Sequence, residues 1–129
     1  MAEQIKNNVF YVGAKDPDRE LFDELIPLPD GTTYNSYLVK GSEKVALIDT
    51  VDPSKVDELW AHLEQLNVNN IDYIIANHAE QDHSGSIPQV LEKFPRAVVV
   101  TNEKCKGMLI DLLHIADDKF LVVEDGSSL

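Results

Sequence analysis

The residues best suited to chemistry lie in one six-residue stretch, His78-Ala79-Glu80-Gln81-Asp82-His83, here called the metal loop. Four of its six side chains are imidazoles or carboxylates, which are common metal ligands. Because an extended backbone sends alternate residues to the same side, we expect His78, Glu80 and Asp82 to line one wall. A turn at His83 would bring that imidazole round to a second ion. Nitrogen and oxygen ligands without a thiolate favour iron, manganese or zinc over copper(I) or an iron–sulfur cluster.

The metal loop follows directly on Tyr73-Ile74-Ile75-Ala76, the most apolar strand-like run in the sequence. Open sheets place their ligands and chemistry in loops at the carboxyl ends of buried strands. The alternative is a plain solvated loop between a strand and a helix, since such loops often contain Asp, Glu and an occasional His. Two histidines and two carboxylates separated by only two spacers favour the metal site.

Hydrophobic patterning predicts alternating strands and helices around this loop. Short β-branched and apolar runs predict strands, and two of them are joined by Gly41-Ser42-Glu43 as a hairpin. Apolar residues at helical spacing predict helices, the first opened by Pro53. The acidic, proline-containing segment 16–29 predicts a surface loop with a helical turn around 20–25. Strands are expected at 9–12, 34–40, 44–49, 72–76, 97–101 and 120–123, and helices at 53–67, from 84–86 through 94, and at 103–113.

Four other chemically capable side chains are expected to be structural. His62 lies off the apolar stripe of its helix and is expected to face solvent, whereas Trp60 lies on the stripe and is expected in the core. His114 follows the helix 103–113 and is expected to cap it. Cys105 is expected in the core, because it belongs to an apolar stripe with Met108, Leu109 and Leu112.

Composition narrows the class of protein. The chain has 129 residues, so it is expected to form one domain or less, with an ordinary 43% of hydrophobic residues. Its net charge of −12 repels phosphate backbones and argues against a nucleic-acid partner. One cysteine requires no oxidising compartment, and neither a membrane span nor a secretory signal is evident. We therefore expect a cytoplasmic protein without a membrane partner.

The pattern His-x-Glu-x-Asp-His in the metal loop resembles the metal motif of the metallo-β-lactamase superfamily, whose hydrolases have His in place of Glu80. The substitution resembles the flavodiiron proteins, and so do the segments Tyr11-Val12-Gly13-Ala14, 31–38 and 47–51. The similarity extends over essentially the whole chain. It implies an α/β fold, the αββα sandwich of that superfamily, of which this chain would supply the N-terminal part as a mixed sheet with flanking helices.

The resemblance also implies roles for individual residues. His78 and Glu80 would bind one iron, and Asp82 and His83 its neighbour. A further histidine per iron and a bridging carboxylate would lie beyond the chain, so the diiron site would be incomplete here, and we expect the chain alone to hold little metal tightly. Asp49, which ends the strand 44–49, either caps a turn or supports the metal ligands in the way the matching Asp does in the superfamily.

The implied activity is that of a diiron oxidoreductase reducing O2 to water or NO to N2O within a longer protein. Electrons would come from FMN in a domain absent from this chain, supplied by a rubredoxin-like or flavoprotein electron donor, and the full-length protein would be a homodimer. A dizinc hydrolase and a non-catalytic diiron sensor of O2 or NO remain open alternatives, of which the first is disfavoured by Glu80.

The end of the sequence adds one expectation about domain organisation. Asp125-Gly126 is a strong hairpin signal, yet only three residues follow it. We therefore expect residues 1–129 to be the N-terminal portion of a longer metallo-β-lactamase-like domain.

Overall fold

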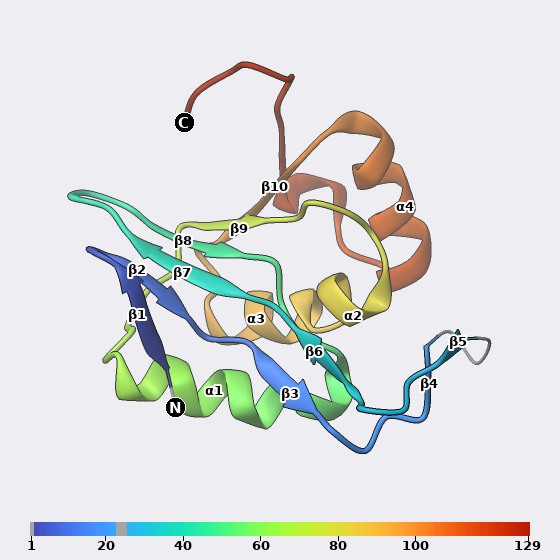
Figure 1. Ribbon diagram of the computed structural model, residues 1–129. Coiled ribbons are helices and arrows are strands. Elements are labelled where there is room, and N and C mark those ends of the chain that lie inside the picture. The colour runs from blue at the N-terminus through green and yellow to red at the C-terminus, as the bar shows by residue number, and fades with distance from the viewer. Residues whose placement is uncertain (1, 23–25) are drawn as a thin grey trace.

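A computed structural model describes residues 2–22 and 26–129 and shows one large sheet with helices packed along it (Figure 1). Within the described residues the sheet has seven strands in the order β1-β2-β7-β8-β9-β10-β11. Pairing is antiparallel from β1 to β8 and parallel from β8 to β11. This is the mixed sheet with flanking helices that the sequence predicted.

The strands of the large sheet are β1 (Glu3–Lys6), β2 (Val9–Tyr11), β7 (Tyr37–Lys40), β8 (Val45–Ile48), β9 (Tyr73–Ile75), β10 (Val98–Thr101) and β11 (Phe120–Val122). Two small antiparallel pairs are formed by β3 (Ala14–Asp16) with β6 (Thr32–Tyr34), and by β4 (Leu21–Phe22) with β5 (Ile26–Pro27). The helices are α1 (Val56–Gln65), α2 (Gln81–Ser84), α3 (Ile87–Lys93) and α4 (Glu103–Leu113), with short 3-10 turns at η1 (Pro53–Lys55) and η2 (Asp117–Lys119).

One face of the sheet forms the core. Leu38, Leu47, Ile74 and Val99 lie in register on neighbouring strands and have no exposed surface. Helices α1 and α3 lie along this side and contribute the apolar residues that belong to the same cluster (Figure 1). Burial of such side chains, at about 25 cal/mol per Å² of apolar surface, is the main force that fixes the strands behind the site.

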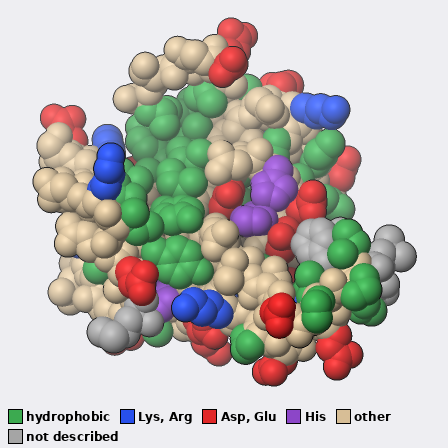
Figure 2. Space-filling model, viewed as in Figure 1, with side chains coloured by type: hydrophobic (Ala, Val, Ile, Leu, Met, Phe, Trp, Pro, Cys, Tyr) green, Lys and Arg blue, Asp and Glu red, His purple; other side chains and the backbone are tan. Residues whose placement is uncertain are grey.

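The opposite face is also apolar. Tyr37, Ile48, Ile75, Val100 and Leu121 lie in register across five strands, and Leu121 is 40% exposed. Figure 2 shows hydrophobic side chains gathered on the face of the sheet turned toward the viewer. A strand that is apolar on both faces is typical of a sheet covered on both sides.

The expectation of one continuous strand over 34–40 is wrong. The chain leaves β6 at Tyr34 and enters the large sheet only at Tyr37, because the backbone crosses Gly13 at this point. A Cβ on Gly13 would lie 2.1 Å from the carbonyl oxygen of Tyr34 and 2.8 Å from the nitrogen of Ser36. Only a residue without a side chain permits so close a crossing, which divides the predicted strand into two.

The prediction for His62 is wrong as well. Its side chain is buried, and its Nδ1 lies 3.0 Å from the carbonyl oxygen of Val12. This contact ties α1 to the end of β2 across 50 positions of sequence. A polar side chain off the apolar stripe can thus be buried when a carbonyl accepts its hydrogen bond.

The apolar stripe predicted for α4 is only partly buried. Cys105 and Leu109 are buried as expected, whereas Met108 is 44% exposed and Leu112 is 64% exposed. The buried side of the helix therefore follows positions four residues apart. The predicted cap is confirmed, because His114 ends the helix in the left-handed conformation, with its N–H donating to the carbonyl of Ile110.

The first predicted helix is shorter than expected. It begins with the 3-10 turn η1 and its α-helical part ends at Gln65. Trp60 on this helix is half-buried against the core, and the ammonium nitrogen of Lys93 lies 4.7 Å from its ring centroid. Among the described residues, no helix combines the length and apolar character needed to cross a bilayer.

Two further expectations concern loops. The helical turn expected around 20–25 falls partly outside the described residues, and Leu21–Phe22 within it form β4. The turn at Asp125-Gly126 is present, with Gly126 at a φ of +84°, and no strand follows it within the described residues.

Candidate metal centre

The site lies where two parallel neighbours, β8 and β9, reach their carboxyl ends. Ile48 pairs with Ile75, so the residues that follow them leave the sheet side by side. Asp49 comes directly after β8, and the metal loop begins three residues after β9. Sheet order therefore brings a carboxylate from one connection against imidazoles from another, at the edge where open sheets bind ligands.

The expectation that the metal loop is extended is wrong from Gln81 onward, whereas Glu80 keeps an extended backbone. The N–H groups of His83 and Ser84 both donate to the carbonyl of Glu80, at 3.0 and 2.8 Å, and Gln81–Ser84 form the single helical turn α2. In a helix successive side chains rotate around the axis and do not alternate between two sides. Asp82 and His83 are thus both turned toward His78, and Glu80 is left at the N-terminal end of the turn.

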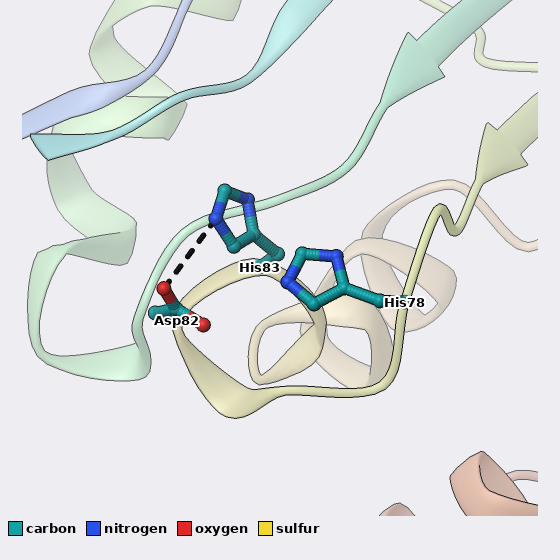
Figure 3. A group of neighbouring side chains, drawn as sticks. All are labelled: His78, Asp82 and His83. Carbon is teal, nitrogen blue, oxygen red and sulfur yellow. Dashed lines mark ion pairs between the residues drawn. The ribbon is translucent and has the colours of Figure 1, made fainter. Parts of the chain in front are cut away.

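Three of the four predicted ligands converge. One ligand atom from each of His78, Asp82 and His83 lies within 4.8 Å of the others. The Nε2 of His83 is 3.4 Å from Asp82 Oδ2, and the ring centroids of the two histidines are 4.5 Å apart. Figure 3 shows the three side chains gathered over the turn that leads into α2. Their mutual closeness brings two imidazoles and a carboxylate to one point.

Glu80 lies outside this group. It is exposed, and it lines a hollow between α2 and α4 together with Leu112 and Leu113. Its backbone is fixed by the helical hydrogen bonds that its carbonyl accepts, so its carboxylate can reach the histidines only through rotation of its own side chain.

Asp49 is held firmly beside the group. It is 7% exposed and has a φ of +57°, a conformation that Asp and Asn adopt more readily than most residues. Its two carboxylate oxygens accept hydrogen bonds from the backbone and side-chain nitrogens of Asn77, at 2.9 and 3.1 Å. Oδ2 also lies 3.6 Å from Nδ1 of His83. A carboxylate in this position favours the tautomer with the proton on Nδ1, which leaves Nε2 free to face Asp82.

The backbone of His83 is anchored from the β8 side. Both the N–H and the hydroxyl of Thr50 donate to the carbonyl of His83, each at 2.7 Å. Behind the loop, a Cβ on Gly85 would lie 2.6 Å from both Pro53 Cδ and the carbonyl oxygen of Gln81. This close approach at Gly85 fixes α2 against the segment that follows β8.

The residue set fits one metal ion. Asp82 Oδ1 and His83 Nδ1 are buried and make no hydrogen bond within the described chain. Bonds of about 2.0–2.2 Å place the ligands of one ion no more than about 4.4 Å apart. The three ligand atoms, which lie within 4.8 Å of one another, need to move only slightly closer to reach that limit. Two imidazoles with a carboxylate suit iron, manganese or zinc. Without Glu80, the described residues do not present a second group of ligands.

Two residues that matter here were not singled out in the sequence. Asn77 holds Asp49 through two hydrogen bonds, and Thr50 holds the His83 carbonyl through two more. Each stands next to a residue that was singled out. Both Asn77 and Thr50 are polar residues that closely follow the ends of neighbouring strands, and this position in the sequence could have identified them.

Comparisons with known proteins agree with this geometry. The chain is 38% identical to the coenzyme F420H2 oxidase of Methanothermobacter marburgensis, over 99% of the chain and 32% of that protein. It is 34% identical to the anaerobic nitric oxide reductase flavorubredoxin of Vibrio vulnificus, over 100% of the chain and 26% of that protein. The crystal structure of the flavodiiron protein from Giardia intestinalis matches with a TM-score of 0.91 and 28% identity, over 100% of this chain and 31% of that one.

The chain thus spans between about a quarter and a third of the length of these relatives. Their names confirm the predicted resemblance to flavodiiron proteins. The sequence profile described as "Metallo-beta-lactamase superfamily" matches residues 29–120, which is well over half of the chain and includes the metal loop. The chain belongs to the metallo-beta-lactamase superfamily.

Proposed function

We propose that this chain is the part of a flavodiiron-type oxidoreductase that supplies the first ligands of its metal centre. The complete protein would reduce O2 to water, NO to N2O, or both. The observation that carries the proposal is the convergence of His78, Asp82 and His83 in a chain whose relatives include an F420H2 oxidase and nitric oxide reductases. Those relatives are similar over essentially the whole chain, so the shared part includes the metal loop.

The proposed ligand roles follow the resemblance. His78 and Glu80 would bind one iron, and Asp82 and His83 the other, with the remaining ligands supplied from outside this chain. Glu80 would have to rotate from its exposed position toward His78. Bound ferrous ions would supply the electrons and the binding site for the diatomic substrate. A carboxylate at this position adds a hard, anionic ligand, which suits iron in its oxidised state.

Asp49 would act as a positioning residue. Its Oδ2, 3.6 Å from His83 Nδ1, would hold the proton on that nitrogen and keep Nε2 available for the metal. The contacts from Thr50 to the His83 carbonyl would keep the ring from swinging away when a ligand binds. These roles require the metal site to be preorganised by β8 and its following residues before any ion binds.

The cofactors and partners extend the same proposal. FMN would be bound in a domain outside this chain and would pass electrons to the irons, and a rubredoxin-like or flavoprotein donor would reduce it. The names flavorubredoxin and rubredoxin oxygen:oxidoreductase, borne by similar proteins, support such a donor. The complete protein would be a cytoplasmic homodimer serving electron transport.

The test uses the complete product of the gene that encodes this chain. Metal content is measured by mass spectrometry, and consumption of O2 and of NO is measured with a chemical reductant and added FMN. We expect two irons per chain and consumption of at least one gas. Glu80→Gln should lower iron content and rate, whereas Glu64→Gln, at an exposed site on α1, should change neither.

Each alternative gives a different result. Zinc in place of iron, with hydrolytic activity, would establish the hydrolase and overturn the proposal. Two irons that bind O2 or NO without turnover would establish a sensor and overturn it as well.

A further inference from the structure

We propose that a cavity between α1 and the first three strands binds a small organic cation that carries an ammonium or guanidinium group. The cavity has a volume of about 200 Å³ and is lined by Glu3, Tyr11, Gly13, Lys15, Glu58 and His62. None of these residues belongs to the metal loop, so the inference goes beyond the proposed function and does not depend on it.

Two hydrogen bonds hold α1 against the strands that form the opposite wall of the cavity. The N–H of Ala2 donates to Oε1 of Gln65 at 3.0 Å, and Nδ1 of His62 lies 3.0 Å from the carbonyl oxygen of Val12. Figure 1 shows α1 running beneath β1 and β3. The helix is thus attached to the start of the chain at one point and to the end of β2 at another, which keeps the cavity open between them.

The wall opposite the helix depends on a glycine and on strand pairing. Gly13 contributes no side chain, and a Cβ at this position would lie 2.9 Å from the hydroxyl oxygen of Tyr11. Glu3 on β1 pairs with Tyr11 on β2, so a carboxylate and a phenol come from neighbouring positions of two strands. The missing side chain therefore leaves room beside the hydroxyl of Tyr11.

His62 presents an unused hydrogen-bond acceptor at this cavity. Its side chain is 8% exposed, and a carbonyl oxygen can only accept, so the contact with Val12 places a proton on Nδ1. In the neutral ring Nε2 is then an acceptor, and no described residue donates to it. Because a buried polar atom without a partner is costly, the ring favours a ligand that brings an N–H donor.

The charges around the cavity favour a cation. Glu3 and Glu58 contribute two carboxylates, whereas Lys15 is the one lining residue with a fixed positive charge. The ammonium nitrogen of Lys55 approaches Glu58 only to 3.9 Å, and the Glu58 side chain is 44% exposed. With a neutral imidazole the lining has a net charge of −1, in a chain whose net charge is −12. Such a site attracts cations and repels phosphates and carboxylates.

The phenol of Tyr11 senses both carboxylates. Burial raises the pKa of Tyr11 most, followed by the negative field of Tyr37 and then by the charges of Glu58 and Glu3. The hydroxyl therefore stays protonated and neutral, and its oxygen can still accept a hydrogen bond. The cavity thus offers four kinds of acceptor atom close together: two carboxylates, an imidazole nitrogen and a phenol oxygen.

This set of acceptors fits an organic cation better than a bare metal ion. Among the described residues, the metal loop alone brings three metal-ligand side chains within 4.8 Å of one another. An ammonium group has three N–H donors and a guanidinium group has five, so either can serve acceptors that are spread around a cavity. The volume lies below the roughly 300–1,000 Å³ of sites for drug-sized molecules, which limits the ligand to a short stem.

The experiment uses calorimetry at low salt on the complete product of the gene that encodes this chain. The probes are butylammonium and butylguanidinium, with 1-butanol and butyrate as neutral and anionic compounds of similar shape. We expect at least one of the two cations to bind once per chain and at least about fivefold more tightly than butanol, because hydrogen bonds to a charged partner are stronger. Butyrate should not bind.

Two charge variants at the cavity should act in opposite directions. Glu58→Gln removes a carboxylate and should weaken binding of the cation about threefold or more, whereas Lys15→Gln removes a repelling charge and should strengthen it. Glu64→Gln makes the same chemical change as Glu58→Gln on an exposed position of α1 outside the cavity and should leave binding unchanged. Circular dichroism shows whether each variant folds. His62 is left intact, because its replacement would also remove the contact with Val12.

The inference is overturned by several results. If neither cation binds, or if butanol binds as tightly as both cations, the cavity holds only water. If Glu64→Gln weakens binding as much as Glu58→Gln, the cation is attracted only by the overall charge of the chain. Weakening by Lys15→Gln would show that the local charges do not select a cation. None of these results depends on the metal content or the consumption of O2 or NO that tests the proposed function.

Discussion

Replacing Asp49 by Asn removes one negative charge from the residue that orients His83, with little change in shape. Asn is chosen because residue 49 has a φ of +57°, which Asn tolerates better than most other residues. The Asn oxygen can still accept one hydrogen bond from Asn77. Its amide group, however, faces either the Asn77 side-chain nitrogen, which donates in the original arrangement, or His83 Nδ1, which lies 3.6 Å from Asp49 Oδ2.

Relief of this conflict would reverse the His83 tautomer. If Nδ1 accepts from the new amide, the proton moves to Nε2, the nitrogen that faces Asp82. A metal must then displace that proton before it binds. Loss of such outer partners typically weakens metal binding about 10–100-fold, which corresponds to about 1.4–2.7 kcal/mol.

The fold itself should also lose stability. Hydrogen bonds to a charged acceptor contribute about 1.5–3 kcal/mol, against about 0.5–1.5 for neutral pairs. Because Asp49 accepts both donors of Asn77, we expect Asp49→Asn to lower the free energy of unfolding of the metal-free chain by about 1–2 kcal/mol.

The assay pairs urea unfolding of the metal-free chain with a Zn2+ titration of the folded one. Asp111→Asn makes the same chemical change on an exposed position of α4 and should alter neither measurement. Binding of Zn2+ by Asp49→Asn with unchanged affinity would refute the reasoning, since Asp49 would then only cap the end of β8.

Three further predictions concern the framework around the site. Gly13→Ala places a Cβ 2.1 Å from the Tyr34 carbonyl oxygen and should lower the free energy of unfolding, measured with urea, by about 1–3 kcal/mol or more. Gly107→Ala on α4 places a Cβ where nothing lies within 4 Å and should raise the free energy of unfolding by about 0.5–1 kcal/mol. Equal stability of these two variants would contradict the crossing described at Gly13. Tyr34→Phe removes the hydroxyl that donates to buried Asp16 at 2.8 Å, and should cost about 1–3 kcal/mol in the same assay; a loss well under 0.5 kcal/mol would show that Asp16 finds another donor. Hydrogen bonds from the Val45 N–H and the Asn70 amide hold the pKa of Asp72 below its usual range. Its contribution to stability is therefore present above roughly pH 4 and is lost as pH falls through the lower pKa of the folded state. Asp72→Asn should flatten the acid side of the curve of stability against pH, and an unchanged acid slope would count against this assignment.

The strands behind the site could be predicted because their sequences are unambiguous. Val45–Ile48, Tyr73–Ile75 and the first three residues of Val98–Thr101 are continuously apolar, which is typical of strands in a sheet covered on both faces. The residue types of the metal loop likewise indicated a metal site before any fold was known. Both signals are local, so a single sequence is enough to show them.

What could not be predicted depends on contacts between distant segments. The break between Tyr34 and Tyr37 arises where another part of the chain crosses at Gly13, and His62 is buried by a carbonyl 50 residues away. The turn α2 is a single helical turn, too short to give a periodic pattern. This turn leaves Glu80 apart from His78 and Asp82, with which the expected alternation of an extended strand had grouped it.

The central claim is that the metal loop supplies ligands to a pair of irons in the complete protein. It is tested most directly by anomalous diffraction at the iron absorption edge from a crystal of the complete protein. The account predicts two anomalous peaks, one within bonding distance of His78 and Glu80 and the other within bonding distance of Asp82 and His83. Peaks that lie away from the metal loop, or a metal other than iron, would contradict it.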